Sequence, residues 1–349
     1  MDDSTDARLG DMRPRQVIDA DRLDAYLREH LDGFEGPLEI RQYAGGQSNP
    51  TYALITPGQR YVLRRKPPGQ LLASAHAIDR EYRIISALAP RGIPVPRARI
   101  YCNDADVIGT PFYIMDHLDG RIFRDPRLPG FPSDERAAIY DEMSRVLATL
   151  HGVDIKSAGL TDFGRFGGYV SRQLKRWMGQ YGEAGDIESD SMDFLMEWLP
   201  SHAPADEETT IVHGDYRLEN LVFHRSEPQV IGVLDWELAT LGNPLADLAY
   251  NCMVYRLSLP MQPGFAGAVP AGIPSEAGAI ESYRERTGRG VTAEQWRFYM
   301  AFSLFRLAAI SAGIYRRGLT GSASSDSAHE FLTHTRTIAD AGATAARGP

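Results

Sequence analysis

The chain has 349 residues, enough for two lobes or two domains, and 43% of them are hydrophobic, an ordinary share for a globular protein. Its 37 basic and 46 acidic side chains give a formal net charge of -9 with no Lys/Arg run, which argues against nucleic acid as a partner. The two cysteines, Cys102 and Cys252, offer no disulfide framework and indicate a reducing compartment. We therefore expect a cytoplasmic protein.

No export signal or membrane span is expected. The first residues are acidic and lack the apolar segment that follows the basic start of a signal peptide. The most apolar long segment, residues 299–315, is interrupted by Arg306 and is shorter than the roughly 20 residues that cross a membrane. This segment predicts a buried helix.

The first third of the chain predicts a mobile tail followed by a small lobe. Residues 1–18 are polar and unpatterned, and residues 19–115 hold the lobe. Leucines at helical spacing predict a helix from Asp21 that ends near Gly33, and a second apolar stripe predicts a helix through residues 78–89. Five strands are predicted, at residues 38–44, 52–56, 60–66, 98–102 and 112–115.

Residues 116–349 predict a larger, mostly helical lobe. Ser133 is expected to cap a helix that extends to about Leu150, and Pro244 to open one that runs through Tyr250. Two amphipathic helices are predicted within residues 169–199. Further helices are predicted at residues 275–286, 292–315 and 326–340, after a Gly/Pro-rich loop at residues 258–274.

One stretch, residues 211–237, gathers polar groups around a predicted hairpin. Its apolar runs, residues 221–223 and 230–234, are separated by residues that reverse a chain. Asp215 and Asn220 lie before the first run, and Asp235 directly follows the second. Two carboxylates and an amide oxygen are ligands that suit Mg²⁺. The alternative is structural: Asp215 caps a turn, Asn220 forms an Asx-turn and Asp235 ends a strand.

The stretch reads H-G-D-Y-R-L-E-N and then L-D-W-E, which resembles the catalytic loop and metal-binding triplet of the aminoglycoside phosphotransferase and choline kinase superfamily. The resemblance implies an α+β, bilobal protein-kinase-like fold with a five-stranded antiparallel small lobe and a larger helical lobe that carries the catalytic hairpin. It also implies that Asp215 is the catalytic proton acceptor and that Asn220 and Asp235 bind Mg²⁺. ATP is the expected nucleotide, with GTP left open.

Three neighbours of this motif have alternative roles. His213 resembles the family's loop histidine, which is a structural hydrogen-bonding group, and an acid-base role is the weaker alternative. Glu237 fits either an acid on the acceptor side or a surface carboxylate. Asp247 matches a family aspartate that buttresses the catalytic loop, and it also suits a helix N-terminus.

A glycine-containing loop predicts a phosphate-binding flap in the small lobe. Gly45, Gly46, Gln47, Ser48 and Asn49 lie between the first two predicted strands, where glycine lets backbone N–H groups approach phosphate oxygens. The string lacks the spacing G-x-G-x-x-G. A simple hairpin turn therefore remains the alternative.

A cation on the third predicted strand is expected to hold the nucleotide phosphates. Strand alternation places Arg64 and Lys66 on one face, and the family alignment places Arg64 where kinases carry lysine. Its expected partner is Glu81 on the following helix. Lys66 is the competing candidate, at the strand end. Met115 is expected at the hinge, beside the adenine.

The sequence predicts the identity of the phosphate acceptor less specifically than it predicts the nucleotide site. The strings G-G-Q-S-N, V-L-R-R-K-P-P-G, R-E-Y and R-W-x-x-Q-Y look most like the kinase-like domains associated with acyl-CoA dehydrogenases. That resemblance implies a small-molecule O-kinase acting on a hydroxyacyl-CoA-type metabolite, with an aminoglycoside as the alternative. A nucleotide-binding pseudokinase that serves as an interaction module is an alternative of another class. Arg64 favours it, and the three retained polar residues of the hairpin motif oppose it. The oligomeric state is left open.

Overall fold

The computed structural model describes residues 4–5, 9–13, 16–44, 49–67, 78–185, 187–205, 208–260, 262–265, 267–319 and 328–348. The chain folds into two compact units. Unit 1 comprises Met1–Arg124, Ala158–Leu160 and Leu218–Ala239, and unit 2 comprises Asp125–Ser157, Thr161–Arg217 and Thr240–Pro349. The predicted hairpin, which the sequence analysis assigned to the larger lobe, groups with unit 1.

A six-stranded antiparallel sheet forms the frame of unit 1. Its strands lie in the order β1-β2-β3-β4-β6-β5. They are β1 (Leu9–Gly10), β2 (Glu39–Tyr43), β3 (Thr51–Ile55), β4 (Arg60–Arg65), β5 (Ala98–Cys102) and β6 (Phe112–Asp116). The five predicted strands are all present, and the α+β kinase-like fold is confirmed.

The additional strand, β1, departs from the expected mobile tail. Leu9 and Gly10 pair with Tyr43 and Gln42 at the sheet edge, and Ile18 is buried in the core of unit 1. A two-residue strand is too short to show a periodic pattern in the sequence. Its position is fixed by pairing with a distant segment. Residues 9–13 and 16–18 are therefore part of the fold.

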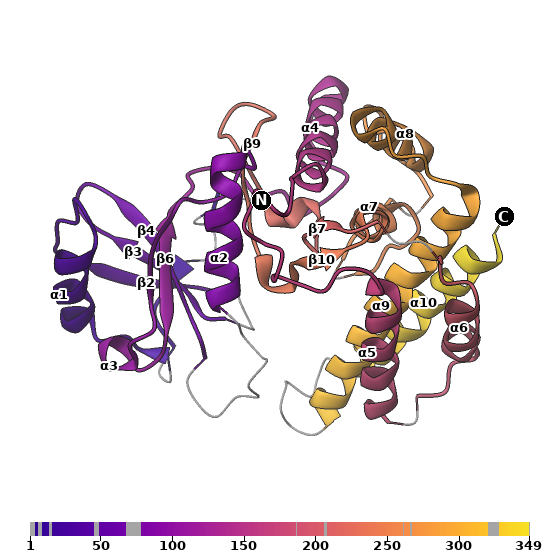
Figure 1. The fold of residues 1–349 in the computed structure, drawn as a ribbon, viewed down its shortest axis with the longest axis horizontal. Coiled ribbons are helices and arrows are strands. Elements are labelled where there is room, and N and C mark those ends of the chain that lie inside the picture. Colours follow the sequence, from indigo (N-terminus) through magenta and orange to yellow (C-terminus); the bar gives the residue numbers. More distant parts are fainter. Residues whose placement is uncertain are drawn as a thin grey trace. The chain divides into compact units, whose positions relative to one another are not determined.

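Helices cover the two faces of this sheet. Figure 1 shows α1 (Ala20–His30) and the short α3 (Ala105–Ile108) on one face and α2 (Ile78–Leu88) on the other. Alternation along β4 separates the two environments: Leu63 joins the core beside α1, while Val62 and Arg64 line a pocket on the opposite face. The predicted boundaries of both long helices are met within a few residues.

The predicted hairpin is also present in unit 1. β8 (Leu221–Phe223) pairs with β9 (Val230–Val233) in an antiparallel ladder. Phe223 exchanges two backbone hydrogen bonds of 2.8 Å with Arg121, which ties the hairpin to the segment that follows β6. A Cβ atom at Gly120 would collide with the Phe223 carbonyl oxygen, so this close approach requires glycine.

Unit 2 contains most of the helices that the sequence predicts. They are α4 (Ser133–His151), α5 (Tyr169–Glu183), α6 (Asp190–Ser201), α7 (Pro244–Cys252), α8 (Glu276–Thr287), α9 (Ala293–Leu319) and α10 (Ala328–Arg347). Figure 1 shows α5 and α10 beside α9. An unpredicted antiparallel pair, β7 (Thr210–Val212) with β10 (Thr240–Gly242), flanks the hairpin in sequence. The predicted cap at Ser133 is wrong: Ser133 is the first helical residue, and no side chain caps α4.

The central helix of unit 2 is α9. It has 27 residues, longer than predicted, and by length and composition it is the one helix among those described that could cross a membrane. However, 78% of its most apolar window is buried inside the protein. Core helices pass the same test, so we describe α9 as the buried helix that the sequence predicted. Cys102 and Cys252 are both buried and free.

Candidate active site

A buried ion pair joins the sheet of unit 1 to its key helix. Arg64 projects from β4, and its Nε lies 3.2 Å from Oε2 of Glu81 on α2. Both side chains are almost fully buried. The Arg64 guanidinium also lies 3.5 Å from the carboxylate of Asp235. The predicted Arg64–Glu81 pair is therefore present, and Arg64 bridges it to the end of the hairpin.

Glu81 is held by more than its ion pair. Asn49 donates a hydrogen bond of 2.7 Å to Oε1, and the Tyr113 hydroxyl donates one of 2.9 Å to Oε2. Burial raises the pKa of the Glu81 carboxyl above its ordinary value, while the Arg64 charge and these two hydrogen bonds oppose the rise. The network fixes the Glu81 side chain, and through it the guanidinium of Arg64.

The opposite strand face confirms the predicted alternation of β4. Arg65 donates hydrogen bonds to the backbone oxygens of Gln16, at 2.8 Å, and Ile108, at 3.4 Å, and stacks over the ring of Tyr52. Lys66 follows the end of β4 and does not line the pocket that Arg64 enters. The structure thus presents Arg64 to the pocket, not Lys66.

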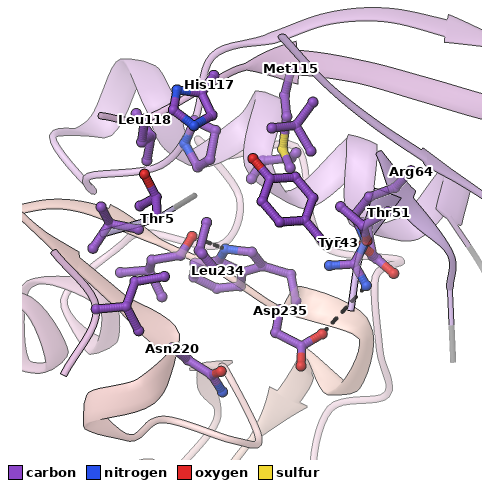
Figure 2. A pocket seen from close by; sticks show the side chains of 18 of the residues that line it. Thr5, Tyr43, Thr51, Arg64, Met115, His117, Leu118, Asn220, Leu234 and Asp235 are labelled. Carbon is purple, nitrogen blue, oxygen red and sulfur yellow. Dashed lines mark hydrogen bonds and ion pairs between the residues drawn. The ribbon is translucent and has the colours of Figure 1, made fainter. Parts of the chain in front are cut away.

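A pocket of about 310 Å³ within unit 1 contains the hairpin residues and Arg64. Figure 2 shows Asp235 facing Arg64 across one end of this pocket, with Asn220 at the same end. Asp235 has a left-handed backbone conformation, with φ of 66°, which is uncommon outside glycine. The Leu234 backbone N–H, just past the end of β9, donates to the Asn220 carbonyl at 2.8 Å, which holds Asn220 beside the residue that precedes Asp235.

These two side chains fit a hard cation. Among the described residues no cluster of three or more His, Cys, Asp or Glu side chains forms a metal site. Asp235 and Asn220 instead offer one carboxylate and one amide oxygen. Mg²⁺ is commonly bound through one or two protein oxygens, with the remaining positions taken by water and substrate phosphates. The donor set therefore suits Mg²⁺ better than a metal that requires a complete protein cage.

The rest of the pocket is mainly apolar. Val62, Met115, Val222 and Trp236 contribute to its walls, so a flat apolar ring would be desolvated between the sheet and the hairpin. Thr5 also lines it, held by a 3.1 Å hydrogen bond from its backbone N–H to the Gly120 carbonyl. The N-terminal segment thus contributes to a site that sequence reasoning assigned only to later residues.

In unit 2, the loop that carries Asp215 is anchored by Asp247. The Asp247 carboxylate accepts hydrogen bonds from the backbone N–H groups of His213, at 2.5 Å, and Gly214, at 2.8 Å. Burial alone would raise the pKa of Asp247, but its hydrogen bonds from His151 and from the Gly214 N–H hold that pKa below its ordinary value. This geometry favours the buttressing role of Asp247.

The loop itself is shaped around Asp215. Gly214 has a φ of 83°, which permits the sharp turn before Asp215. The Asp215 backbone N–H donates to His213 Nδ1 at 3.2 Å, so that nitrogen is an acceptor and His213 serves the loop structure. Arg217 Nε lies 3.5 Å from the Asp215 carboxylate. Asp215 is therefore a partly exposed carboxylate on a rigid loop.

The remaining predicted positions have different outcomes. Gly45, Gly46, Gln47 and Ser48 lie outside the described residues. Asn49, predicted with them, directs its side chain to Glu81 instead of to the pocket. Met115 lines the pocket as expected of a hinge residue, and Glu237 is exposed.

Sequence reasoning missed two polar contributors to the Glu81 network, Asn49 and Tyr113. The position of Tyr113 on β6, opposite Arg64 on β4, is a signal that strand pairing could have supplied. Nothing local in the sequence marks Thr5 as a pocket residue.

Comparisons with known proteins extend this description. A family model described as the phosphotransferase enzyme family matches residues 39–276. Acyl-CoA dehydrogenase family member 10 of Mus musculus is 45% identical over 334 residues, which are 94% of this chain and 31% of that protein. Family member 11 of Homo sapiens is 42% identical over 341 residues, 96% of this chain and 44% of that protein. The chain thus spans less than half the length of these relatives.

Solved structures show the same fold. A Ralstonia eutropha protein provisionally named an aminoglycoside phosphotransferase has 46% identity and a TM-score of 0.86, with 95% of this chain and 99% of that chain covered. A spectinomycin phosphotransferase, solved with ADP and spectinomycin, has 12% identity and a TM-score of 0.62, with 93% and 98% covered, and shares the fold alone. With the buried ion pair, the hairpin and the matched family model, the chain belongs to the phosphotransferase enzyme family.

Proposed function

We propose that the protein transfers the γ-phosphoryl group of ATP to a hydroxyl of a small molecule, in a reaction that requires Mg²⁺. The observation that carries this proposal is the meeting of Arg64, Glu81, Asn220 and Asp235 at one end of an apolar pocket. A cation, a hard-metal donor set and an apolar slot are the three parts that a nucleoside triphosphate requires. The ADP bound to the spectinomycin phosphotransferase, a protein of the same fold, supports the same assignment.

Each part of the nucleotide has a proposed receptor. Arg64 clamps the α- and β-phosphates through its planar guanidinium, and Glu81 orients it. Met115, which lines the pocket, lies beside the base. Asn220 and Asp235 hold Mg²⁺, which when bound neutralises charge on the transferring phosphoryl group.

The transfer then needs one proton acceptor. Asp215 takes the proton of the acceptor hydroxyl as its oxygen forms a bond to the γ-phosphorus. The bond from that phosphorus to the β-γ bridging oxygen breaks, and ADP leaves with the electron pair. The anchored loop supports this role, because Asp247 and Gly214 fix the backbone around Asp215. A rigid loop keeps the carboxylate in position without reorganisation during the reaction.

The proposed acceptor is a hydroxyacyl thioester or a related hydroxy metabolite. The two named mouse and human relatives are acyl-CoA dehydrogenase family members, matched at 42–45% identity over more than nine tenths of this chain. The spectinomycin phosphotransferase has 12% identity, which supports the fold and not its substrate. The names of the two dehydrogenase-family relatives therefore support acyl-CoA chemistry, which we propose, and the name of the Ralstonia eutropha protein, at 46% identity, supports the aminoglycoside alternative.

The test is a screen for phosphorylated product. Purified protein with Mg-ATP is incubated with hydroxyacyl-CoAs, hydroxy acids, aminoglycosides, choline and sugars, and product is identified by mass spectrometry beside ADP release. We expect phosphorylation of a hydroxyacyl substrate that is lost in Asp215→Asn. Nucleotide binding without any phosphorylated product would support the pseudokinase alternative and contradict the proposal. Product formation that survives in Asp215→Asn would remove Asp215 from the chemistry.

A further inference from the structure

Arg306 is a buried cation that has no anionic partner among the described residues. It lies on α9 and is only 6% exposed. Its guanidinium carbon lies 5.4 Å from the ring centre of Trp177 on α5 and 5.1 Å from that of Tyr250 on α7. Its Nε is buried without a hydrogen-bond acceptor.

The two aromatic rings offset only part of the free-energy cost of burying the Arg306 charge. The effective cost of desolvating a charged group in a protein is several kcal/mol. A cation over an aromatic face recovers about 0.5 to 2 kcal/mol. An Arg side chain in this position would therefore gain from an anionic oxygen that arrives with a ligand. A guanidinium suits such a group because it offers several donors in a fixed plane.

The surroundings add positive charge. The Arg176 guanidinium lies 4.7 Å from the same Trp177 ring, on the α5 helix. Partial burial lowers the pKa of Arg176, and the charge of Arg306 lowers it further, so the two cations are close enough to repel one another. Two arginines that share one aromatic ring form a site that favours an anion and disfavours a cation.

This group lies next to the proposed base within unit 2. Burial raises the pKa of the Tyr250 hydroxyl, and the Asp215 carboxylate, which accepts a hydrogen bond from it, raises it further, while Arg306 and Arg217 oppose that rise. Tyr250 therefore interacts with Arg306 through its ring and with Asp215 through its hydroxyl.

We propose that the acceptor carries an anionic oxygen group, a carboxylate or a phosphate, that binds Arg306. This inference rests on the proposed function, since it places the acceptor beside Asp215. It makes Arg306 a specificity-determining residue and disfavours polycationic acceptors such as aminoglycosides. The anionic group belongs either to a free hydroxy acid or to the phosphates of a coenzyme A ester.

The experiment compares matched acceptors and variants. A hydroxy acid is paired with its methyl ester, and its coenzyme A ester with its pantetheine thioester, which lacks the phosphoadenosine part. Arg306→Met removes the charge, Arg306→Lys retains it, and Arg297→Met, at an exposed position on the same helix, is the control. Steady-state kinetics and thermal unfolding are measured for each protein.

We expect Arg306→Met to raise the acceptor KM of one anionic substrate by about 10- to 100-fold, the usual range for a lost hydrogen bond to a charged group. The KM for ATP and the KM for the neutral partner should change less than about twofold. Arg306→Lys should recover part of the loss, and Arg297→Met should resemble the wild type. The substrate pair that shows the effect identifies the carboxylate or the phosphate as the group recognised.

Two results would overturn the inference. One is an equal loss for the charged and neutral members of both pairs. The other is a lowered Tm with an unchanged acceptor KM, which is the behaviour of a structural arginine. If Arg306→Met does not fold, the wild type and Arg306→Lys still decide the question, because absence of any preference for anionic acceptors contradicts it. Calorimetric titration with the hydroxy acid and with coenzyme A, without ATP, keeps this test separate from a failure of phosphotransfer.

Discussion

The most informative single perturbation separates Arg64 from Glu81. Glu81 is 1% exposed and accepts hydrogen bonds from Asn49 and Tyr113 in addition to its ion pair. Arg64→Ala leaves that carboxylate buried with its two neutral donors alone. Glu81→Gln leaves Arg64 with Asp235, at 3.5 Å, as its one carboxylate within ion-pair distance among the described residues. Each change should weaken nucleotide binding, because each displaces or disorders the phosphate clamp.

The magnitude follows from the distance and burial. Opposite charges 3.2 Å apart attract by about 5 kcal/mol at an effective dielectric constant of about 20. Removing one partner of a buried pair commonly destabilises a protein by about 3 to 5 kcal/mol. If the two residues act as one unit, the double variant should lose less than the sum of the single losses, with a coupling of about 0.5 to 3 kcal/mol.

The assay is a double-mutant cycle on kcat/KM for the nucleotide, supported by binding of a fluorescent nucleotide and by urea unfolding. Arg64→Lys, which retains a charge, is measured in place of Arg64→Ala if the latter unfolds. Lys66→Ala is the matched control, because Lys66 lies past the end of β4 and does not line the pocket. Coupling of Glu81 to Lys66 and not to Arg64 would refute the reasoning.

Three further predictions use the remaining polar groups. Asp215→Asn should retain nucleotide affinity but lower kcat by about 10²- to 10⁴-fold, as measured by single-turnover phosphotransfer; unchanged turnover would contradict its role as base. Asp235→Ala should reduce the Mg²⁺ dependence of nucleotide binding more than Asn220→Ala, because a charged ligand contributes more to a hard dication; calorimetry with and without Mg²⁺ decides. Asp247 has a pKa below its ordinary value of 3.8, so its contribution to stability is present above pH 3.8 and is lost as the pH falls through its lowered pKa. Asp247→Asn should therefore destabilise the protein by about 3 kcal/mol at pH 7 and flatten its acid unfolding profile, measured with urea; an unchanged profile would show that this carboxylate does not anchor the loop.

Local patterns predicted those parts of the site that depend on periodicity and turn chemistry. Alternation along β4 was sufficient to direct Arg64 and Arg65 to opposite faces, and both are found there. Helical spacing placed Glu81 beside the apolar stripe of α2, from which it reaches Arg64. The hairpin was predictable because two apolar runs flank chain-reversing residues.

Long-range contacts were not predictable from the same patterns. Asn49 reads as part of a glycine-rich flap, yet its amide lies on a carboxylate 32 residues further along the chain. Thr5 reaches the pocket through one backbone hydrogen bond to Gly120, a partner that no local spacing indicates. The strands β7 and β10 have three residues each and exist because they pair with one another. In each case the structure is determined by a distant partner and not by local propensity.

The division of the chain also separates the two halves of the proposed chemistry. Arg64, Glu81, Asn220 and Asp235 all belong to unit 1, whereas Asp215 belongs to unit 2. Asp247 and Arg306 join Asp215 in unit 2, where Asp247 anchors its loop and Arg306 lies over the ring of Tyr250. Substitutions at Arg64 and Glu81 should therefore change kcat/KM for the nucleotide. Substitutions at Arg306 should change KM for the acceptor. Because residues without shared partners contribute independently, a variant that combines Glu81→Gln with Arg306→Lys should show additive free-energy losses within about 0.5 kcal/mol. Strong coupling between them would mean that the acceptor and the nucleotide do not bind through separate groups.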